Sequence, residues 1–229
     1  SIFYDEVSIG KIVLIELKGE INAGSVRVVK KGLSKAEALS AQAVIVKLNT
    51  FGGYLKSTSE IVDSILQTKI KTIAWIPPGG RAVSAGAFIA LACDVIYMGN
   101  GSVIGSAEPR PPDSKVLKFS AAWIRSLAEN RWGRKDERIS IVEKFVLENK
   151  ALSALEALET GIIDAVLNKL DEVLAREGLL NSDVIIVKKG VLDEIISLIG
   201  NPFVIALMVI TGIISLLIEI AFSGFQGLG

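Results

Sequence analysis

The sequence predicts an α/β fold built on a parallel sheet, and three observations support this prediction. Apolar strand patterns alternate with helical patterns from Lys11 to Met98, glycine-bearing turns follow two of the strands, and no internal repeat interrupts the alternation. Strands and helices that alternate in this way form parallel sheets with right-handed crossover connections. A separate apolar segment near the C-terminus indicates that a membrane element follows the α/β domain.

Each element is predicted from the spacing of its apolar residues and from its flanking turn residues. The last helix has the clearest boundaries, because Ser153 and Glu156 match a capping box and Gly161 supplies a stop. The expected strands are 11–17, 43–48, 72–76 and 95–98, and the expected helices are 25–40, 54–68, 84–93, 115–132, 138–149 and 154–160.

The C-terminal segment 203–222 is apolar throughout, apart from Glu219 near its end. A helix of this length is about 30 Å long, which matches the hydrocarbon core of a bilayer. A buried core helix is the alternative, but core helices are usually shorter and flanked by amphipathic sequence. The length and the lack of charge favour a transmembrane helix.

These patterns divide the chain into three parts. Residues 1–165 are expected to form the α/β domain, and residues 166–200 a connector with a short strand at 184–187 and an amphipathic helix from Val191. Residues 201–229 are expected to hold the transmembrane helix and the start of a truncated membrane region.

The composition excludes several classes of function. Lys and Arg together number 25, and Asp and Glu together also number 25, so the chain has no basic excess. A chain without a basic excess is a poor general binder of nucleic acid. The chain has no histidine, which rules out a Ser-His-Asp triad, a Cys-His pair and a histidine-ligated metal site. We expect neither a metal nor a cofactor. The single cysteine, Cys93, lies in an apolar helical pattern and is most simply a small buried residue.

Candidate chemistry lies in the turns at 49–53 and 77–86, because function collects at the carboxyl ends of parallel strands. Ser84 begins the apolar helix and has two interpretations. It is either the N-cap of that helix or a nucleophile whose oxyanion the N–H groups of Ala85 and Gly53 would stabilise. The local sequence favours the N-cap. Glu108 is interpreted as a loop charge.

Several segments together resemble one family. They are the Gly52-Gly53 turn, then PPGGRAVSAGAFIALACD at 77–94, GSVIGSAEP at 101–109 and ALSALEALETGIID at 151–164. In this order they resemble the ClpP/crotonase-like superfamily, and within it the N-terminal protease domain of long NfeD proteins, the membrane-bound partner proteases of stomatin operons. The resemblance covers residues 8–165. The first turn departs from the family's Asp-Thr-Pro-Gly-Gly, because Asn49 and Phe51 replace the Asp and Pro.

The resemblance implies a serine endopeptidase with a Ser–Lys dyad that cleaves apolar peptide segments of a stomatin-like membrane protein. It also implies a homodimer, and a protease domain on the extracytoplasmic side of the membrane. Ser84 matches the family nucleophile, and Gly52, Gly53 and Ala85 match the positions that line the oxyanion site. The catalytic lysine does not match, because Arg125 stands in its place within Trp-Ile-Arg-Ser-Leu-Ala at 123–128.

An arginine side chain keeps its proton in proteins and cannot act as a neutral base. The natural protein is then a pseudoprotease, or the position has been mutated to trap a substrate, or another lysine serves. Lys118 is seven residues from Arg125 on the same helical face, about 10.5 Å along the axis, which is far for catalysis. On helical pattern alone, Arg125 is equally well explained as a solvated residue paired with Glu129.

The helix at 115–132 is expected to bury an apolar stripe formed by Val116, Phe119, Trp123 and Leu127. Three function classes stay open at this point. They are an NfeD-type peptidase whose turnover is reduced by Arg125, an inactive membrane scaffold that binds stomatin-like partners, and an acyl-CoA enzyme of the same superfamily. No feature of the sequence favours CoA.

Overall fold

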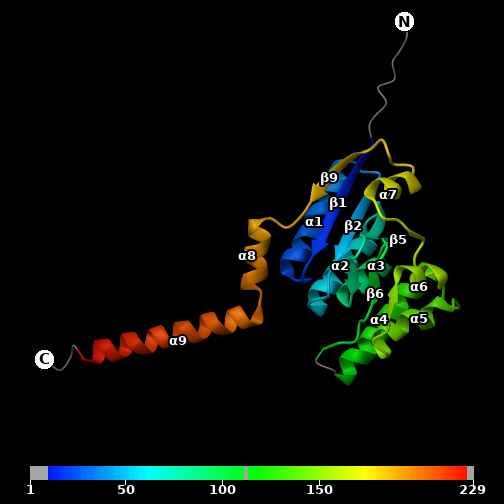
Figure 1. Ribbon diagram of the computed structural model, residues 1–229. Helices are drawn as coiled ribbons and strands as arrows, with labels where there is room; N and C mark the ends of the chain where they lie inside the picture. Colours follow the sequence, from blue (N-terminus) through cyan, green and yellow to red (C-terminus); the bar gives the residue numbers. More distant parts are fainter. Residues whose placement is uncertain (1–9, 111–112, 226–229) are drawn as a thin grey trace, which may run out of the picture.

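A six-stranded parallel sheet forms the centre of the molecule. The computed structural model describes residues 10–110 and 113–225 and orders the strands β8-β5-β3-β2-β1-β9 (Figure 1). All neighbouring pairs in this sheet are parallel, which confirms the predicted fold class. The strands are β1 (Lys11–Lys18), β2 (Ala43–Asn49), β3 (Lys71–Ile76), β5 (Val95–Met98), β8 (Ala165–Val166) and β9 (Asp183–Val187).

Helices cover both faces of the sheet, so the central strands are apolar on both sides. Val13 and Ile15 of β1 pack in the larger core cluster with α1 (Ala23–Ala38), α2 (Leu55–Gln67) and α3 (Ala85–Ala92). Ile12 and Leu14 point to the opposite face and pack in a smaller cluster with α7 (Leu170–Arg176). This division follows from the two-residue period of a strand.

A second, three-stranded sheet lies beside the first and was not predicted. It has the order β4 (Arg81–Val83), β6 (Val103–Gly105) and β7 (Ala151–Ser153). Strands of three residues are too short for an alternating pattern to be recognised. The sheet is accompanied by α4 (Ser114–Trp132), α5 (Arg138–Leu147) and α6 (Ala154–Glu159), and the predicted capping box of α6 is present.

Residues expected to belong to a connector complete the main sheet instead. β8 pairs with β5, β9 pairs with β1, and Val173 and Leu174 of α7 are buried against the smaller core cluster. The α/β body therefore continues to Val187. The sequence pattern placed a strand at 184–187, but it did not show that this strand joins the sheet.

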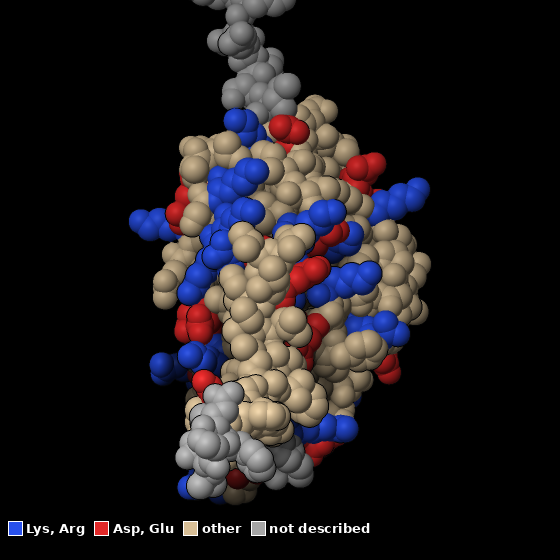
Figure 2. Space-filling view, turned by 90° about the vertical axis from the view of Figure 1, so that its left-hand side faces the viewer, with Lys and Arg blue, Asp and Glu red and all other residues tan. Residues whose placement is uncertain are grey.

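Two helices follow the body. α8 (Val191–Ile199) packs beside α1, and α9 (Pro202–Phe225) extends away from the rest of the chain (Figure 1). Residues Pro202–Phe222 of α9 are long and apolar enough to cross a membrane, and none of the segment is buried. Lys and Arg side chains lie on the face of the body from which α9 projects, with Asp and Glu side chains among them (Figure 2).

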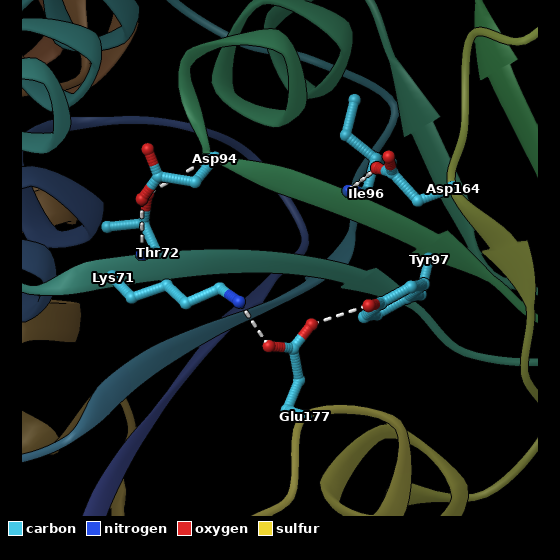
Figure 3. Close-up of polar contacts among 7 residues, drawn as sticks. All are labelled: Lys71, Thr72, Asp94, Ile96, Tyr97, Asp164 and Glu177. Carbon is cyan, nitrogen blue, oxygen red and sulfur yellow. Dashed lines mark hydrogen bonds and ion pairs between the residues drawn. The ribbon is translucent and has the colours of Figure 1, made fainter.

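Polar side chains join the elements at the amino ends of β3, β5 and β8 (Figure 3). The Asp94 carboxylate accepts hydrogen bonds from the Thr72 N–H at 2.7 Å and the Thr72 hydroxyl at 2.9 Å. The Glu177 carboxylate, just after α7, accepts from the Tyr97 hydroxyl at 2.5 Å and pairs with Lys71. Burial and the neighbouring Glu177 raise the pKa of Tyr97 above its usual range.

Candidate functional site

A cavity of about 890 Å³ opens at the carboxyl ends of β2, β4 and β6. Its apolar lining includes Phe51, Leu55, Val83, Phe88 and Val116, and its polar lining includes serine, asparagine and a few charged side chains. No lysine lines it among the residues that the structure describes. An apolar cleft with a few polar groups is typical of a ligand-binding site.

Ser84 lines this cavity, at a sharp turn between β4 and α3. Its backbone has φ 53° and ψ −114°, a conformation that residues with a side chain rarely adopt. The Ser84 N–H donates to the Gly105 carbonyl at 2.9 Å, which holds the turn in place. Ser84 occupies the N-cap position of α3, but its hydroxyl makes no capping hydrogen bond, so the N-cap interpretation holds for the position and not for the side chain. The local sequence revealed neither this backbone conformation nor the missing capping bond.

Gly52 lies directly against Ser84. A Cβ added at Gly52 would lie 2.7 Å from the Ser84 Cβ and 3.0 Å from its hydroxyl oxygen, and Gly52 has φ +120°. The Gly52 N–H donates to the Thr50 hydroxyl at 2.9 Å, so it is already occupied. Gly52 therefore contributes space beside Ser84 rather than a hydrogen-bond donor.

Gly53 and Ala85 supply the free donors of the site. Both residues line the cavity, and Ala85 is the first residue of α3, where backbone N–H groups have no acceptor within the helix. Within residues 10–110 and 113–225, neither the Gly53 N–H nor the Ala85 N–H donates to another group. Two unpaired donors next to a serine hydroxyl are the arrangement that stabilises an oxyanion.

Strained backbone concentrates at the same cavity. In the described part of the chain, four residues other than glycine have a positive φ, and Ser84, Ser106 and Asn149 among them line the cavity. The Ser106 hydroxyl donates to the Asn149 side-chain oxygen at 2.9 Å. Such backbone strain tends to accumulate at functional sites. Sequence reasoning missed both residues, and the only available signal was that Ser106 follows Gly105.

Arg125 is not among the residues that line the cavity. Its Nε donates to a carboxylate oxygen of Glu143 on α5 at 2.5 Å, and its side chain is half exposed. The expected pair with Glu129 is therefore corrected to a pair with Glu143, which no pattern within one helix could have predicted. Lys118 is exposed and does not line the cavity either.

The buried face of α4 also differs from the expected apolar stripe. Phe119 is exposed, whereas Ala121, Ile124 and Ala128 are buried and Leu127 is buried as predicted. Trp123 is partly buried and stacks on Phe88 of α3, with 4.5 Å between the ring centroids. α4 is thus rotated relative to the prediction, because its contacts with α3 and α5 decide which face is covered.

Other sequence-based expectations have simple outcomes. Glu108 lies in a loop and forms no ion pair with Arg81, Arg110 or Arg125 among the described residues, as expected, and it also lines the cavity. Cys93 is buried, as expected, and burial raises the pKa of its thiol to about 12. The described residues contain no cluster of three carboxylate or thiol side chains that could hold a metal ion.

Comparisons with known proteins agree with this architecture. The model of the family "NfeD1b, N-terminal domain" matches residues 11–187. The membrane-bound protease PH1510 of Pyrococcus horikoshii is 29% identical over 94% of this chain and 54% of its own length. The chain spans about half the length of the curated relatives that it matches.

Solved structures with the same fold include proteases. A lysine-to-alanine mutant of the 1510-N membrane-bound stomatin-specific protease, in complex with a substrate peptide, has a TM-score of 0.76 and 26% identity over 85% of this chain and 99% of that one. ClpP1 from Listeria monocytogenes has a TM-score of 0.56 and is 22% identical, over 70% of this chain and 94% of its own. At this identity the match shows the shared fold alone.

Proposed function

Because the chain belongs to the family of NfeD1b N-terminal domains, we propose that it carries a membrane-bound serine endopeptidase site of the NfeD type. The substrate is an apolar peptide segment of a stomatin-like membrane protein. The observation that carries the proposal is the Ser84 hydroxyl, which lines the cavity free of any capping bond and stands beside Gly53 and Ala85 with their unpaired N–H groups. The relatives named as stomatin-specific proteases support the substrate class.

The proposed chemistry is acyl transfer. The Ser84 oxygen attacks the peptide carbonyl carbon, and the N–H groups of Gly53 and Ala85 receive the negative charge that develops on the carbonyl oxygen. The C–N bond then breaks, the new amine takes a proton, and water hydrolyses the acyl ester. The proton that leaves Ser84 needs a base, which a Ser–Lys dyad would supply through a neutral lysine.

Arg125 occupies the position of that lysine. A guanidinium does not accept the serine proton, and here it is engaged with Glu143 outside the cavity lining. We therefore expect strongly reduced or absent turnover for this chain. Losing a general base typically lowers the rate by about 10² to 10⁴.

The same observation favours a second candidate, a catalytically inactive scaffold. The cavity would then hold an apolar segment of a stomatin-like partner without cleaving it. The Arg125–Glu143 pair and the absence of lysine from the described lining support this candidate. The two candidates share the peptide site and differ only in turnover.

The test is incubation of the chain with an apolar peptide, compared with the variants Ser84→Ala and Arg125→Lys. We expect slow or no cleavage by the present chain, and a rate that rises by about 10² or more in Arg125→Lys. Binding that survives Ser84→Ala, with no cleavage by Arg125→Lys, selects the scaffold. Efficient cleavage that Ser84→Ala leaves unchanged overturns the assignment of the nucleophile.

Membrane association is supported by membrane-bound relatives and by the candidate span in α9. We propose further that the α/β body faces the extracytoplasmic side and that the protein is a homodimer. Protease protection of the body in sealed vesicles tests the side, and the mass of the detergent-solubilised chain by light scattering tests the dimer.

A further inference from the structure

α8 is an amphipathic helix whose polar side faces the protein. Asp193 and Ser197, four residues apart, lie against the start of α1, and Asp193 is buried. The Ser197 hydroxyl donates to the Asn22 side-chain oxygen at 2.8 Å, and Arg27 lies 2.9 Å from the Asp193 carboxylate. A Cβ at Gly24 would lie 2.1 Å from the Ser197 hydroxyl oxygen, so the two helices approach closely. Polar and small residues therefore fix α8 on α1.

The apolar side of α8 is exposed. Its five members occur at the spacing of one helical stripe, and their exposed fractions range from 44% to 74%. They are Val191, Leu192, Ile195, Leu198 and Ile199. A helix of a water-soluble body normally buries its apolar stripe and exposes its polar one. Because the orientation is inverted here, this apolar stripe needs a cover other than the body of the protein.

We propose that α8 lies in the membrane–water interface and that its apolar stripe is covered by lipid. α8 is continuous with α9 through Gly200 and Asn201, and α9 is the candidate span. α9 leaves α8 at a sharp turn (Figure 1), so a membrane crossed by α9 runs alongside α8. Short helices with one apolar and one polar side bind to membranes in this position.

Charge favours the same occupant. α1, to which α8 is fixed, exposes Lys30, Lys31 and Lys35, of which Lys30 pairs with Glu60. Further Lys and Arg side chains lie among Asp and Glu on the face from which α9 projects (Figure 2). Lysines near a membrane surface attract anionic headgroups. A second copy of the chain is a weaker candidate, because five side chains are far fewer than the roughly 20–30 residues that each partner contributes to a standard interface.

The experiment measures lipid contact of a fluorescent label in the full chain. The chain is reconstituted in vesicles of phosphatidylcholine and phosphatidylglycerol, some of them carrying a nitroxide lipid with its quencher near the headgroup. The label is attached through Leu192→Cys on the stripe. Leu180→Cys, on a residue 57% exposed before β9, is the matched control, and Val209→Cys on α9 reports insertion. Cys93 is buried, so the label enters the new cysteine.

We expect the nitroxide lipid to quench the Leu192 label about twofold or more, and to leave the Leu180 label nearly unchanged. If the Val209 label is quenched but the Leu192 and Leu180 labels are quenched equally weakly, the proposal is overturned. If the Val209 label is not quenched, α9 lies outside the membrane and the proposal is overturned as well. Shielding of the Leu192 label that persists in detergent and disappears on dilution assigns the stripe to a second copy instead. None of these outcomes depends on peptidase activity.

Discussion

In the part of the chain that the structure describes, polar groups at the amino ends of the parallel strands are hydrogen-bonded, whereas several at the carboxyl ends are not. At the amino ends of β3, β5 and β8, the carboxylates of Asp94, Asp164 and Glu177 all have donors from neighbouring elements (Figure 3). At the carboxyl ends of β2 and β4, the N–H groups of Gly53 and Ala85 lack acceptors among the described residues, and Ser84 has a strained backbone.

This difference indicates that the amino ends of the strands stabilise the fold and that the carboxyl ends bind the proposed peptide. The paired carboxylates tie α7 and β8 to the sheet. Unpaired donors and strain weaken the fold where they occur, and they persist only where the surrounding structure fixes them. Changes at the carboxyl end should therefore affect peptide binding, and changes at the amino end should affect stability alone.

Gly52→Ala is expected to have the largest effect, because it fills the space beside Ser84 and also strains the backbone at residue 52. The new Cβ meets Ser84, and the residue must also keep φ +120°. We expect a loss of about 2–4 kcal/mol of stability and no detectable peptide binding, measured by urea unfolding and peptide titration. Gly178→Ala is the control, since Gly178 has φ +72° with no neighbouring atom. Unchanged peptide binding in Gly52→Ala would contradict the proposed site.

Glu177→Ala tests the opposite end of the sheet. The variant removes the acceptor of the Tyr97 hydroxyl and the partner of Lys71 from a side chain that is 6% exposed. We expect unfolding to become easier by about 1–3 kcal/mol, with peptide affinity unchanged. A parallel loss of peptide affinity in the folded variant would show that the two ends are coupled.

Two serines at helix starts offer a finer comparison. Ser153 caps α6 through its hydroxyl and Ser84 does not cap α3. Ser153→Ala is expected to cost about 1 kcal/mol in thermal or urea unfolding, and Ser84→Ala less than about 0.5 kcal/mol. An equal cost for both would mean that Ser84 acts as a cap after all.

The smallest expected effect is a dependence of stability on alkaline pH. Burial raises the pKa values of Cys93 and Tyr97, so the folded state keeps protons that the unfolded state releases as pH rises. The stabilisation is complete below the unfolded pKa values and falls above them, by about 0.5 kcal/mol at pH 9 relative to pH 7. Urea midpoints that do not fall, or that rise, would contradict the burial of these groups.

The sequence was sufficient to predict the helices and strands whose structure is decided by their own pattern of apolar residues. The apolar strands, the helices between them and the capping box of Ser153 were predicted within a few residues of their bounds. The Gly52-Gly53 turn and Ser84 were found because the glycines and the order of motifs are local features. These are cases in which neighbouring residues carry the information.

Features that depend on distant residues were missed. The local sequence favoured a capping role for the Ser84 hydroxyl, because residue preference carries no information on the positive φ of Ser84 or on its N–H bond to Gly105. Arg125 was paired within its own helix, whereas its partner Glu143 lies on the next one. The amphipathic pattern of α8 was seen, but which side would meet α1 depends on Asn22 and Arg27.

The most direct test of the account is a crystal structure of the chain with an apolar peptidyl boronate, which adds to a serine oxygen. We predict a boron–oxygen bond to Ser84 and a boronate oxygen within about 3 Å of the Gly53 and Ala85 nitrogens. A boronate bound to another residue, or one whose oxygens point away from both N–H groups, would contradict it.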